Sequence, residues 1–367
     1  MSLVQTQRDT LLRPLSIVSG IVERRHTLPI LANILVRKDG TDVSFVSTDI
    51  DIQITTRAPI GAGKEAVATT VAARKLLDIL RALPDGAVKL GLADKKLSVE
   101  SGKSKFKLQT LSADDFPVFN TASSFAAQFT MPQKMLKHLF GMVHFAMAQQ
   151  DIRYYLNGLL LVADGNWVHA VATDGHRLAY CTTSVASALP KTDVIIPRKT
   201  IIELQRLLGD SEDPVHIDIA SNQIRFTFGE IELVSKLVEG KFPDYQRVIP
   251  SGYTRSFGIG REDLMHALQR VAIVTSDRFR GVRCVIGEGA LKISSTNADQ
   301  EDAHEELEIP YDGPSLEIGF NVSYLLDVLG NLKSEHVQLS FGDANSSALL
   351  TVPDDANFKY VVMPMRI

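Results

Sequence analysis

The sequence predicts an α+β protein of three repeated domains, each with two helices packed on antiparallel sheets. Two observations predict this fold. Three separate landmarks recur in the same order at one period, and within each period helical stretches alternate with strand-like runs. A length of 367 residues also suits two or three domains better than one.

Each landmark occurs three times along the chain, at intervals between 121 and 126 residues. They are a Thr-Asp pair after a strand-like run (Thr48-Asp49, Thr173-Asp174, Thr296-Asn297), a strand leading into a helix (69–80, 194–205, 318–329, with Arg74, Arg198 and Asn321 in matching places), and an aromatic or Met before Pro (Phe116-Pro117, Phe242-Pro243, Met363-Pro364). Composition loosens near 120–128 and 250–256. We therefore expect domains at 1–124, 125–252 and 253–367.

Each repeat contains two amphipathic stretches with apolar residues every three or four positions. The predicted helices are 8–19, 73–83, 131–148, 198–208, 261–273 and 322–334. Pro14 argues against a straight first helix. Alternating apolar and polar residues at 42–57, 87–93, 96–101 and 105–111 are typical of half-buried antiparallel strands.

Positive charge is concentrated in the predicted helices. They hold thirteen Lys and Arg against six Asp and Glu, although the whole chain has 39 basic and 43 acidic residues. A solvated helix face explains any one helix. A basic face shared by all of them favours contact with phosphates, which gives affinity without sequence readout.

A geometric estimate gives the number of chains such a face would need. Six helices about 10 Å wide enclose too little space for a duplex, whereas twelve leave a hole of about 28 Å. Duplex DNA is about 20 Å across, consistent with its groove dimensions. Two chains are therefore expected.

Composition excludes several classes of protein. Cys181 and Cys284 are too few for a disulfide framework or a thiolate metal site, and we expect both to be buried. No run approaches the ~18 apolar residues that cross a bilayer. We expect a cytosolic protein without metal or cofactor.

The strongest enzyme alternative is a metal-dependent nuclease or phosphatase using Asp49, Asp51, Asp174 and His176. The repeat argues against it, because Asp49 and Asp174 occupy equivalent places in different domains. Gly102-Lys103-Ser104 resembles part of a phosphate loop, but Leu97 stands where that motif needs Gly. We expect no intrinsic catalysis.

Long segments throughout the chain resemble bacterial beta sliding clamps, the beta subunits of DNA polymerase III. They are TDGHRLAYC (173–181), RYYLNGLLL (153–161), PRKTIIEL (197–204), SKLVEGKFPDYQRVIP (235–250), FRGVR (279–283), GFNVSYLLDVL (319–329) and YVVMPMRI (360–367). The resemblance implies clamp-type domains and a head-to-tail homodimer forming a closed six-domain ring, with helices inside. It implies a processivity factor that encircles duplex DNA without sequence specificity and tethers the replicative polymerase alpha subunit, the clamp loader and other replication and repair proteins.

The resemblance also implies site residues. A partner-peptide groove between the second and third domains would use Leu156, Thr173, Gly175, His176, Arg177, Leu178, Pro243, Arg247, Val248, Ser347, Val361, Val362, Met363, Pro364, Met365 and Arg366. Apolar and Met side chains with a few polar groups suit an extended peptide. The tail ends in Ile367, where the family often has Leu.

DNA-contacting positions, by the same resemblance, are Arg25, Arg74, Gln150, Tyr154, Tyr155 and Arg198, although both tyrosines could equally be core residues. Phe106 and Leu108 on an edge strand, and Ile273 and Val274, resemble the two unlike halves of the dimer contact. A scaffold that uses the same ring only to bind proteins is a further alternative, which salt-dependent DNA association would distinguish.

Overall fold

The computed structural model describes residues 2–23, 28–60, 66–120, 122–276 and 280–366. The chain forms two compact units, Met1–Lys134 with Arg206–Leu237 and Met135–Gln205 with Val238–Ile367. The units divide the second repeat between them, so the domain boundaries expected from the sequence stay a prediction. No helix in the described ranges is both long and apolar enough to cross a membrane.

The first unit is built on one antiparallel sheet. In the described residues its twelve strands have the order β1-β6-β7-β8-β5-β2-β3-β4-β14-β13-β12-β9. They are β1 (Ser2–Gln7), β2 (Asn33–Asp39), β3 (Asp42–Thr48), β4 (Ile52–Pro59), β5 (Val67–Ala72), β6 (Ala87–Ala93), β7 (Lys96–Ser101), β8 (Ser104–Leu111), β9 (Ala127–Pro132), β12 (Pro214–Ile219), β13 (Gln223–Phe228) and β14 (Ile231–Lys236). The sheet passes from the first repeat to the second where β4 pairs with β14.

Two helices cover the first-repeat part of this sheet, α1 (Arg8–Val18) and α2 (Ala73–Ala82), with short 3₁₀ turns at Ser19–Ile21 and Pro29–Ala32. Both buried faces repeat every three or four residues, as predicted; α2 buries Leu76, Leu77 and Leu80. Pro14 lies inside α1 rather than ending it. The Pro14 carbonyl accepts a hydrogen bond of 3.3 Å from Thr56 Oγ1 of β4, which ties the helix to the sheet.

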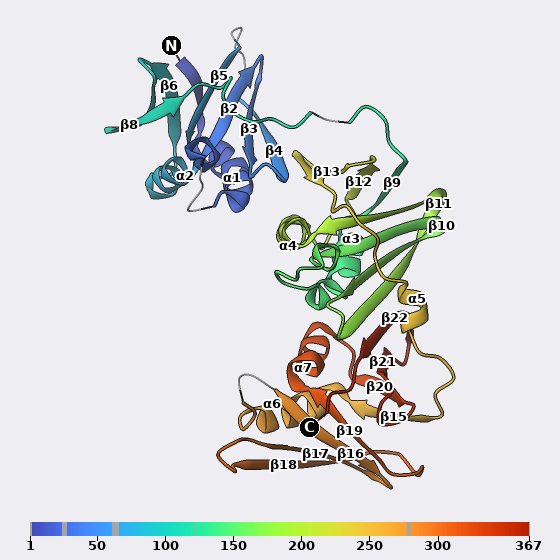
Figure 1. The fold of residues 1–367 in the computed structure, drawn as a ribbon. Helices are drawn as coiled ribbons and strands as arrows, with labels where there is room; N and C mark the ends of the chain where they lie inside the picture. Colours follow the sequence, from blue (N-terminus) through green and yellow to red (C-terminus); the bar gives the residue numbers. More distant parts are fainter. Residues whose placement is uncertain (1, 24–27, 61–65, 121, 277–279, 367) are drawn as a thin grey trace. The chain divides into compact units, whose positions relative to one another are not determined.

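The second unit contains two antiparallel sheets (Figure 1). One has the order β10-β11-β22-β21-β20-β15: β10 (Gly158–Thr173), β11 (Arg177–Pro197), β15 (Arg255–Gly260), β20 (His336–Phe341), β21 (Ala348–Val352) and β22 (Asp355–Val362). The other has the order β18-β17-β16-β19: β16 (Gly281–Gly287), β17 (Ala290–Thr296), β18 (Asp302–Glu308) and β19 (Leu316–Asn321).

The long strands β10 and β11 each correspond to two strands of the first repeat. On either side of Gly165, residues 158–163 of β10 pair with 192–197 of β11, and 167–173 pair with 178–184. Gly40, between β2 and β3, has φ +57°, and Gly165 has φ +56°. Glycine accepts this left-handed backbone without a Cβ clash, so both repeats turn at the same place.

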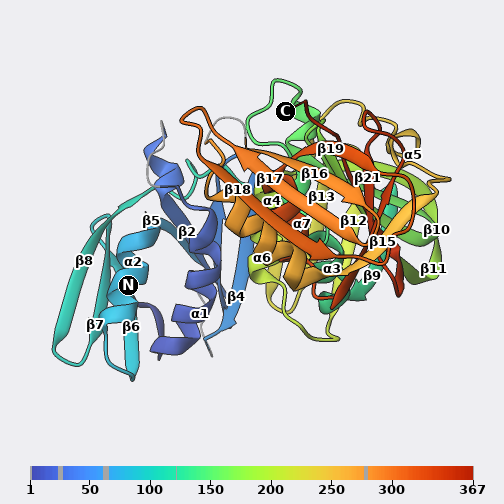
Figure 2. The same ribbon diagram turned by 90° about the horizontal axis from the view of Figure 1, so that it is seen from below.

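The second unit carries most of α3 (Gln133–Gly141) and α4 (Arg198–Leu207), together with α5 (Tyr245–Val248), α6 (Arg261–Ala272) and α7 (Val322–Asn331). Helix α6 packs on β17 and β18, and α7 packs on β19 and β22 (Figures 1 and 2). The 3₁₀ turns His144–Ala146 and Tyr154–Leu156 lie between α3 and β10.

The predicted helix 131–148 is wrong in extent, because α3 ends at Gly141. The backbone leaves helical geometry at Val143 (φ −129°) and becomes extended at Met147. The carbonyl of Phe145 accepts a bond from the Arg177 side chain, and that of Met147 accepts one from Arg198. Arginine side chains from elsewhere in the chain therefore supply hydrogen bonds to carbonyls beyond the end of α3, which have no partner within that helix.

Both cysteines are buried, as predicted, and unpaired. Burial raises the pKa of each thiol to about 12. Each therefore behaves as a small apolar core residue.

Candidate functional site

The Thr-Asp landmark of the second repeat is a tight turn between β10 and β11. Thr173 Oγ1 donates to the Arg177 carbonyl at 2.6 Å, and Asp174 Oδ1 accepts the backbone N–H groups of His176 and Arg177 at 2.9 and 3.1 Å. Gly175 adopts φ +89° at its tip. The turn exposes Gly175 and His176, half-buries Asp174, and buries Thr173 and Arg177.

The first repeat closes an equivalent turn with the same bonds. Thr48 Oγ1 donates to the Ile52 carbonyl at 2.9 Å, and Asp49 Oδ1 accepts the N–H groups of Asp51 and Ile52 at 3.0 and 2.8 Å. Ile50 stands where the second repeat has Gly175 and has φ +82°. The landmark aspartates are therefore turn residues.

In the third repeat Asn297 Oδ1 accepts the N–H groups of Asp299 and Glu301, both at 3.0 Å. Within the described part of the chain, no group of three or more His, Cys, Asp or Glu residues could hold a metal ion. The geometry gives no support to the metal-dependent alternative.

The C-terminal tail is attached to the 173–178 turn. Strand β22 pairs with β11 so that Val362 lies opposite Arg177, and Met363 N–H donates to the His176 carbonyl at 2.8 Å. Met365 N–H donates to the Gly319 carbonyl at 2.9 Å. These bonds hold the tail backbone while the Met363 side chain stays 48% exposed.

One apolar cluster joins the turn, the tail and the 242–249 segment. Its buried members are Leu160, Val162, Val171, Leu178, Ile195, Phe242 and Val361, and the half-buried side chains packed on it are Tyr155, Tyr180, Val238, Tyr245, Ile249 and Leu349. Next to it in sequence, Pro243, Arg247 and Val248 are exposed. We call this cluster, its exposed neighbours, the 173–178 turn and the 361–366 tail together the turn–tail surface.

Most of the predicted partner residues meet at this surface. Leu156 is fully buried, and Ser347 is half-buried, with its carbonyl accepting the Tyr253 hydroxyl at 2.7 Å. The sequence reasoning missed Tyr180 and Tyr245, whose rings stack with centroids 5.9 Å apart. Tyr180 is two residues from Leu178 in β11, so both side chains lie on the same face of the strand. This alternation was the sequence signal that could have identified Tyr180.

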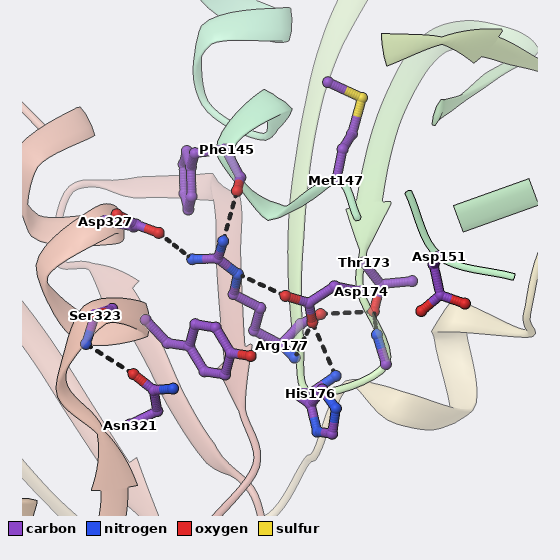
Figure 3. A network of polar contacts seen from close by, with 12 residues as sticks. Phe145, Met147, Asp151, Thr173, Asp174, His176, Arg177, Asn321, Ser323 and Asp327 are labelled. Carbon is purple, nitrogen blue, oxygen red and sulfur yellow. Dashed lines mark hydrogen bonds and ion pairs between the residues drawn. The ribbon is translucent and has the colours of Figure 1, made fainter. Parts of the chain in front are cut away.

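Arg177 is 9% exposed, and its side chain points toward Phe145 and Asp327 (Figure 3). Its Nε donates to Asp174 Oδ2 at 3.1 Å, and its terminal nitrogens donate to Asp327 Oδ2 at 2.5 Å and the Phe145 carbonyl at 2.7 Å. Its Cζ lies 4.5 Å from the centroid of the Tyr324 ring, and the His176 ring stacks on the same tyrosine at 6.4 Å. Burial alone would lower the pKa of Arg177, but Tyr360, Asp327 and Asp174 raise it above its usual value.

The predicted DNA-contacting residues fall into two groups. Arg74 on α2, Gln150 and Tyr154 are exposed, and the Tyr154 side chain is 58% accessible. Tyr155 packs on the apolar cluster, and Arg198 donates to the Met147 carbonyl at 3.3 Å. Burial and the nearby Arg177 lower the pKa of Arg198. Arg25 lies outside the described residues.

The segment that carries Gln150 and Tyr154 is held by its own polar contacts. The Asn157 side chain accepts the Asp151 N–H at 2.9 Å and donates to the Asp151 carbonyl at 2.8 Å. Hydrogen bonds from Arg153 hold the pKa of Asp151 at about 2. The segment therefore has a fixed backbone on which exposed side chains are displayed.

The predicted interface residues lie on exposed edges. Phe106 and Leu108 are on β8, whose residues 104–109 pair with β7; β5 reaches only Thr110 and Leu111. Ile273 follows α6 and is 82% exposed. The sequence reasoning missed strand β18, which ends the second unit's smaller sheet and exposes Asp302, His304, Glu306 and Glu308 along one face.

Comparison with known proteins gives the family. The N-terminal, central and C-terminal domains of the DNA polymerase III beta subunit match residues 3–120, 130–244 and 246–366. The chain belongs to the DNA polymerase III beta subunit family. The three matches confirm the α+β fold of three domains that the period predicts and the clamp type that the resemblance implies.

Similar clamps cover the whole chain. The beta sliding clamp of Pseudomonas aeruginosa is 45% identical over 98% of this chain and 99% of its own length, and that of Escherichia coli K12 is 44% identical over the same shares. A crystal structure of the P. aeruginosa clamp bound to griselimycin superposes with a TM-score of 0.96, 44% identity and complete coverage of both chains.

Membership of the clamp family confirms the prediction of a DNA polymerase processivity factor in DNA replication that is not itself an enzyme. DNA and the polymerase are the partners that the family implies. Which residues of this chain contact them is a separate question.

Proposed function

We propose that two copies of this chain close a six-domain ring around duplex DNA, with domains at 1–124, 125–252 and 253–367, and that the turn–tail surface of each copy tethers the polymerase alpha subunit, the clamp loader and other replication and repair proteins. The observation that carries the tethering role is the assembly of three distant segments on one apolar cluster. The exposed Met363 and Val248 give a partner peptide apolar area to bury.

The proposed partner residues are Leu156, Thr173, Gly175, His176, Arg177, Leu178, Pro243, Arg247, Val248, Ser347, Val361, Val362, Met363, Pro364, Met365 and Arg366. A peptide with one Gln and two or three apolar residues suits a surface of this chemistry. Burying two of its side chains contributes roughly 3–6 kcal/mol before ordering costs, which is consistent with micromolar affinity.

The exposed basic side chains of the helices support contact with DNA. Arg13, Arg74, Lys75, Arg81, Arg206 and Lys333 are exposed and lie on or directly beside helices. Long cations without a base-reading element give phosphate contact and permit sliding. The proposed direct contacts are Arg74, Gln150 and Tyr154, and Arg25 is assigned from sequence alone. The segment that carries Gln150 and Tyr154 is supported by Tyr155 and Arg198.

Opposite charges support the proposed head-to-tail dimer. Strand β8 exposes Lys105 and Lys107 beside Phe106, whereas β18 exposes Glu306 and Glu308. An edge of each kind on one chain can pair with the opposite edge of a second copy, which closes a ring by two heterologous contacts. Ile273 and Val274 would pack against Phe106 and Leu108 at the same contact.

Topological retention tests the proposal. The protein loaded by a clamp loader onto nicked circular DNA should stay bound through gel filtration and should be released when the circle is cut. A protein-binding scaffold of the same fold would show neither retention nor any salt-dependent association with DNA, and that result would overturn the proposal.

A further inference from the structure

The repeats show that the Arg177 side chain is not needed to form its own turn. Ile52 occupies the equivalent place in the first repeat, and that turn closes with the same Thr and Asp hydrogen bonds. The bonds that the Arg177 side chain makes beyond the turn are therefore an addition specific to the second repeat. Their targets indicate what the residue does.

Two of those targets lie on other elements. The Phe145 carbonyl belongs to the 3₁₀ turn that begins the 144–157 segment, and Asp327 belongs to α7, 150 residues away in sequence. With Asp174 also bonded, each of the three guanidinium nitrogens has an acceptor (Figure 3), and one face of the group lies on the Tyr324 ring. These bonds use three of the five N–H donors, and the 9% exposure of Arg177 leaves little of the side chain open to a peptide.

The 144–157 segment is attached to the turn at a second point. Arg153 donates to the Asp174 carbonyl at 3.2 Å, while the same guanidinium binds Asp151 at 2.8 Å. The segment carries the exposed Gln150 between these attachments and the exposed Tyr154 directly after the second. The Met363 N–H donates to the His176 carbonyl, so the tail and the 144–157 segment are both hydrogen-bonded to the backbone of residues 174–176.

We propose that Arg177 is a positioning residue that couples the turn–tail surface to the 144–157 segment, so that DNA binding and partner-peptide binding strengthen each other. The inference rests on the proposed function, because it assigns DNA contact to that segment and peptide contact to that surface. A peptide bound to the surface restricts the motion of the turn and the tail. The hydrogen bonds of Arg177 extend this restriction to Phe145. DNA held by the segment acts in the opposite direction by the same amount, since binding free energies are linked reciprocally.

The test measures peptide affinity with and without DNA. A fluorescein-labelled peptide with Gln and a Leu-Phe pair is titrated by anisotropy against the full-length protein, alone and with a saturating 30-base-pair duplex at low salt. Wild type should bind the peptide about fivefold more tightly with DNA, at the low end of usual coupling. Arg177→Lys, which keeps the charge but cannot reach three acceptors in a plane, and Asp327→Asn should each reduce this factor below twofold.

A matched pair gives the control. Arg225 and Asp218 form a half-buried Arg-Asp contact at 2.6 Å in the first unit, whereas the turn belongs to the second unit. Arg225→Lys and Asp218→Asn should leave the coupling factor at its wild-type value. A loss of coupling in all four variants would mean general destabilisation and would overturn the positioning role.

Hydrogen exchange distinguishes coupling from a purely structural role of Arg177, because only coupling makes the peptide change exchange in the 144–157 segment. In wild type the peptide should slow amide exchange at 144–157 as well as at 173–178. In Arg177→Lys and Asp327→Asn only the second region should respond. Equal peptide affinity with and without DNA in wild type, or unchanged coupling in both variants, would overturn the inference. Absence of peptide or DNA binding by wild type would instead refute the proposed function.

Discussion

Deleting residues 363–367 removes one wall of the turn–tail surface and leaves the helices and β22 in place. The deletion loses the bonds from Met363 to the His176 carbonyl and from Met365 to the Gly319 carbonyl. Met363 is 48% exposed, so a partner can bury about half of a side chain whose full burial is worth roughly 1.5–3 kcal/mol. Met365 is less exposed and contributes less, and the two together give about 1–2.5 kcal/mol, a loss of peptide affinity of roughly 5- to 70-fold.

Fluorescence anisotropy with the labelled peptide measures this loss, and sedimentation velocity checks that the truncated protein is still a dimer. Trp167→Ala is the control, because Trp167 is 45% exposed on β10 and is not a member of the apolar cluster. It should bind the peptide as wild type does. A truncated dimer with unchanged peptide affinity would place the partner site elsewhere.

Four further predictions follow from particular residues. Glutamates at Ile273 and Val274 should give monomers at low micromolar concentration, and a dimer in sedimentation would show that the assigned interface is wrong. Arg74→Ala should make the slope of log K for DNA against log salt shallower by about 1, and an unaltered slope would remove Arg74 from the phosphate contacts. Burial lowers the pKa of His169 below its usual 6.5, so the unfolded chain binds that proton more readily and stability falls as pH drops below about 6.5. His169→Gln should make the fall in Tm between about pH 7 and pH 5 shallower, and an equally steep fall would contradict this. Ile50→Gly should relieve a left-handed conformation that costs an ordinary residue about 1–2 kcal/mol, less roughly 0.5–1 kcal/mol of added chain entropy, and urea unfolding that shows no gain in stability would refute the strain.

The repeat period of the sequence predicted most of the fold. A repeat forces equivalent residues into equivalent places, so Thr48 and Thr173 marked the same turn although their surroundings differ in sequence. Periodicity also located the six long helices to within a few residues, except for α3. The residues after its end are bonded instead by arginine side chains from elsewhere in the chain, which reach the carbonyls of Phe145 and Met147, and no local pattern signals such bonds.

The site was predictable where residues are contiguous and less so where it depends on long-range pairs. The 173–178 turn and the tail could be named from the sequence, because each is one short segment. No local pattern links Arg177 to Asp327, which is 150 residues away, or shows that the guanidinium turns inward. The same limit applies to β18, whose acidic face reads as a solvated strand until the sheet order places it at an edge.

The two buried cysteines have a practical consequence. At neutral pH a thiol with a pKa of about 12 is almost entirely protonated, and neither Cys181 nor Cys284 is open to a reagent in the folded chain. A cysteine placed by mutation on any exposed position will therefore be the thiol that a maleimide modifies. Fluorophores, spin labels and bifunctional cross-linkers can be attached at chosen points of the folded protein without first replacing the native cysteines.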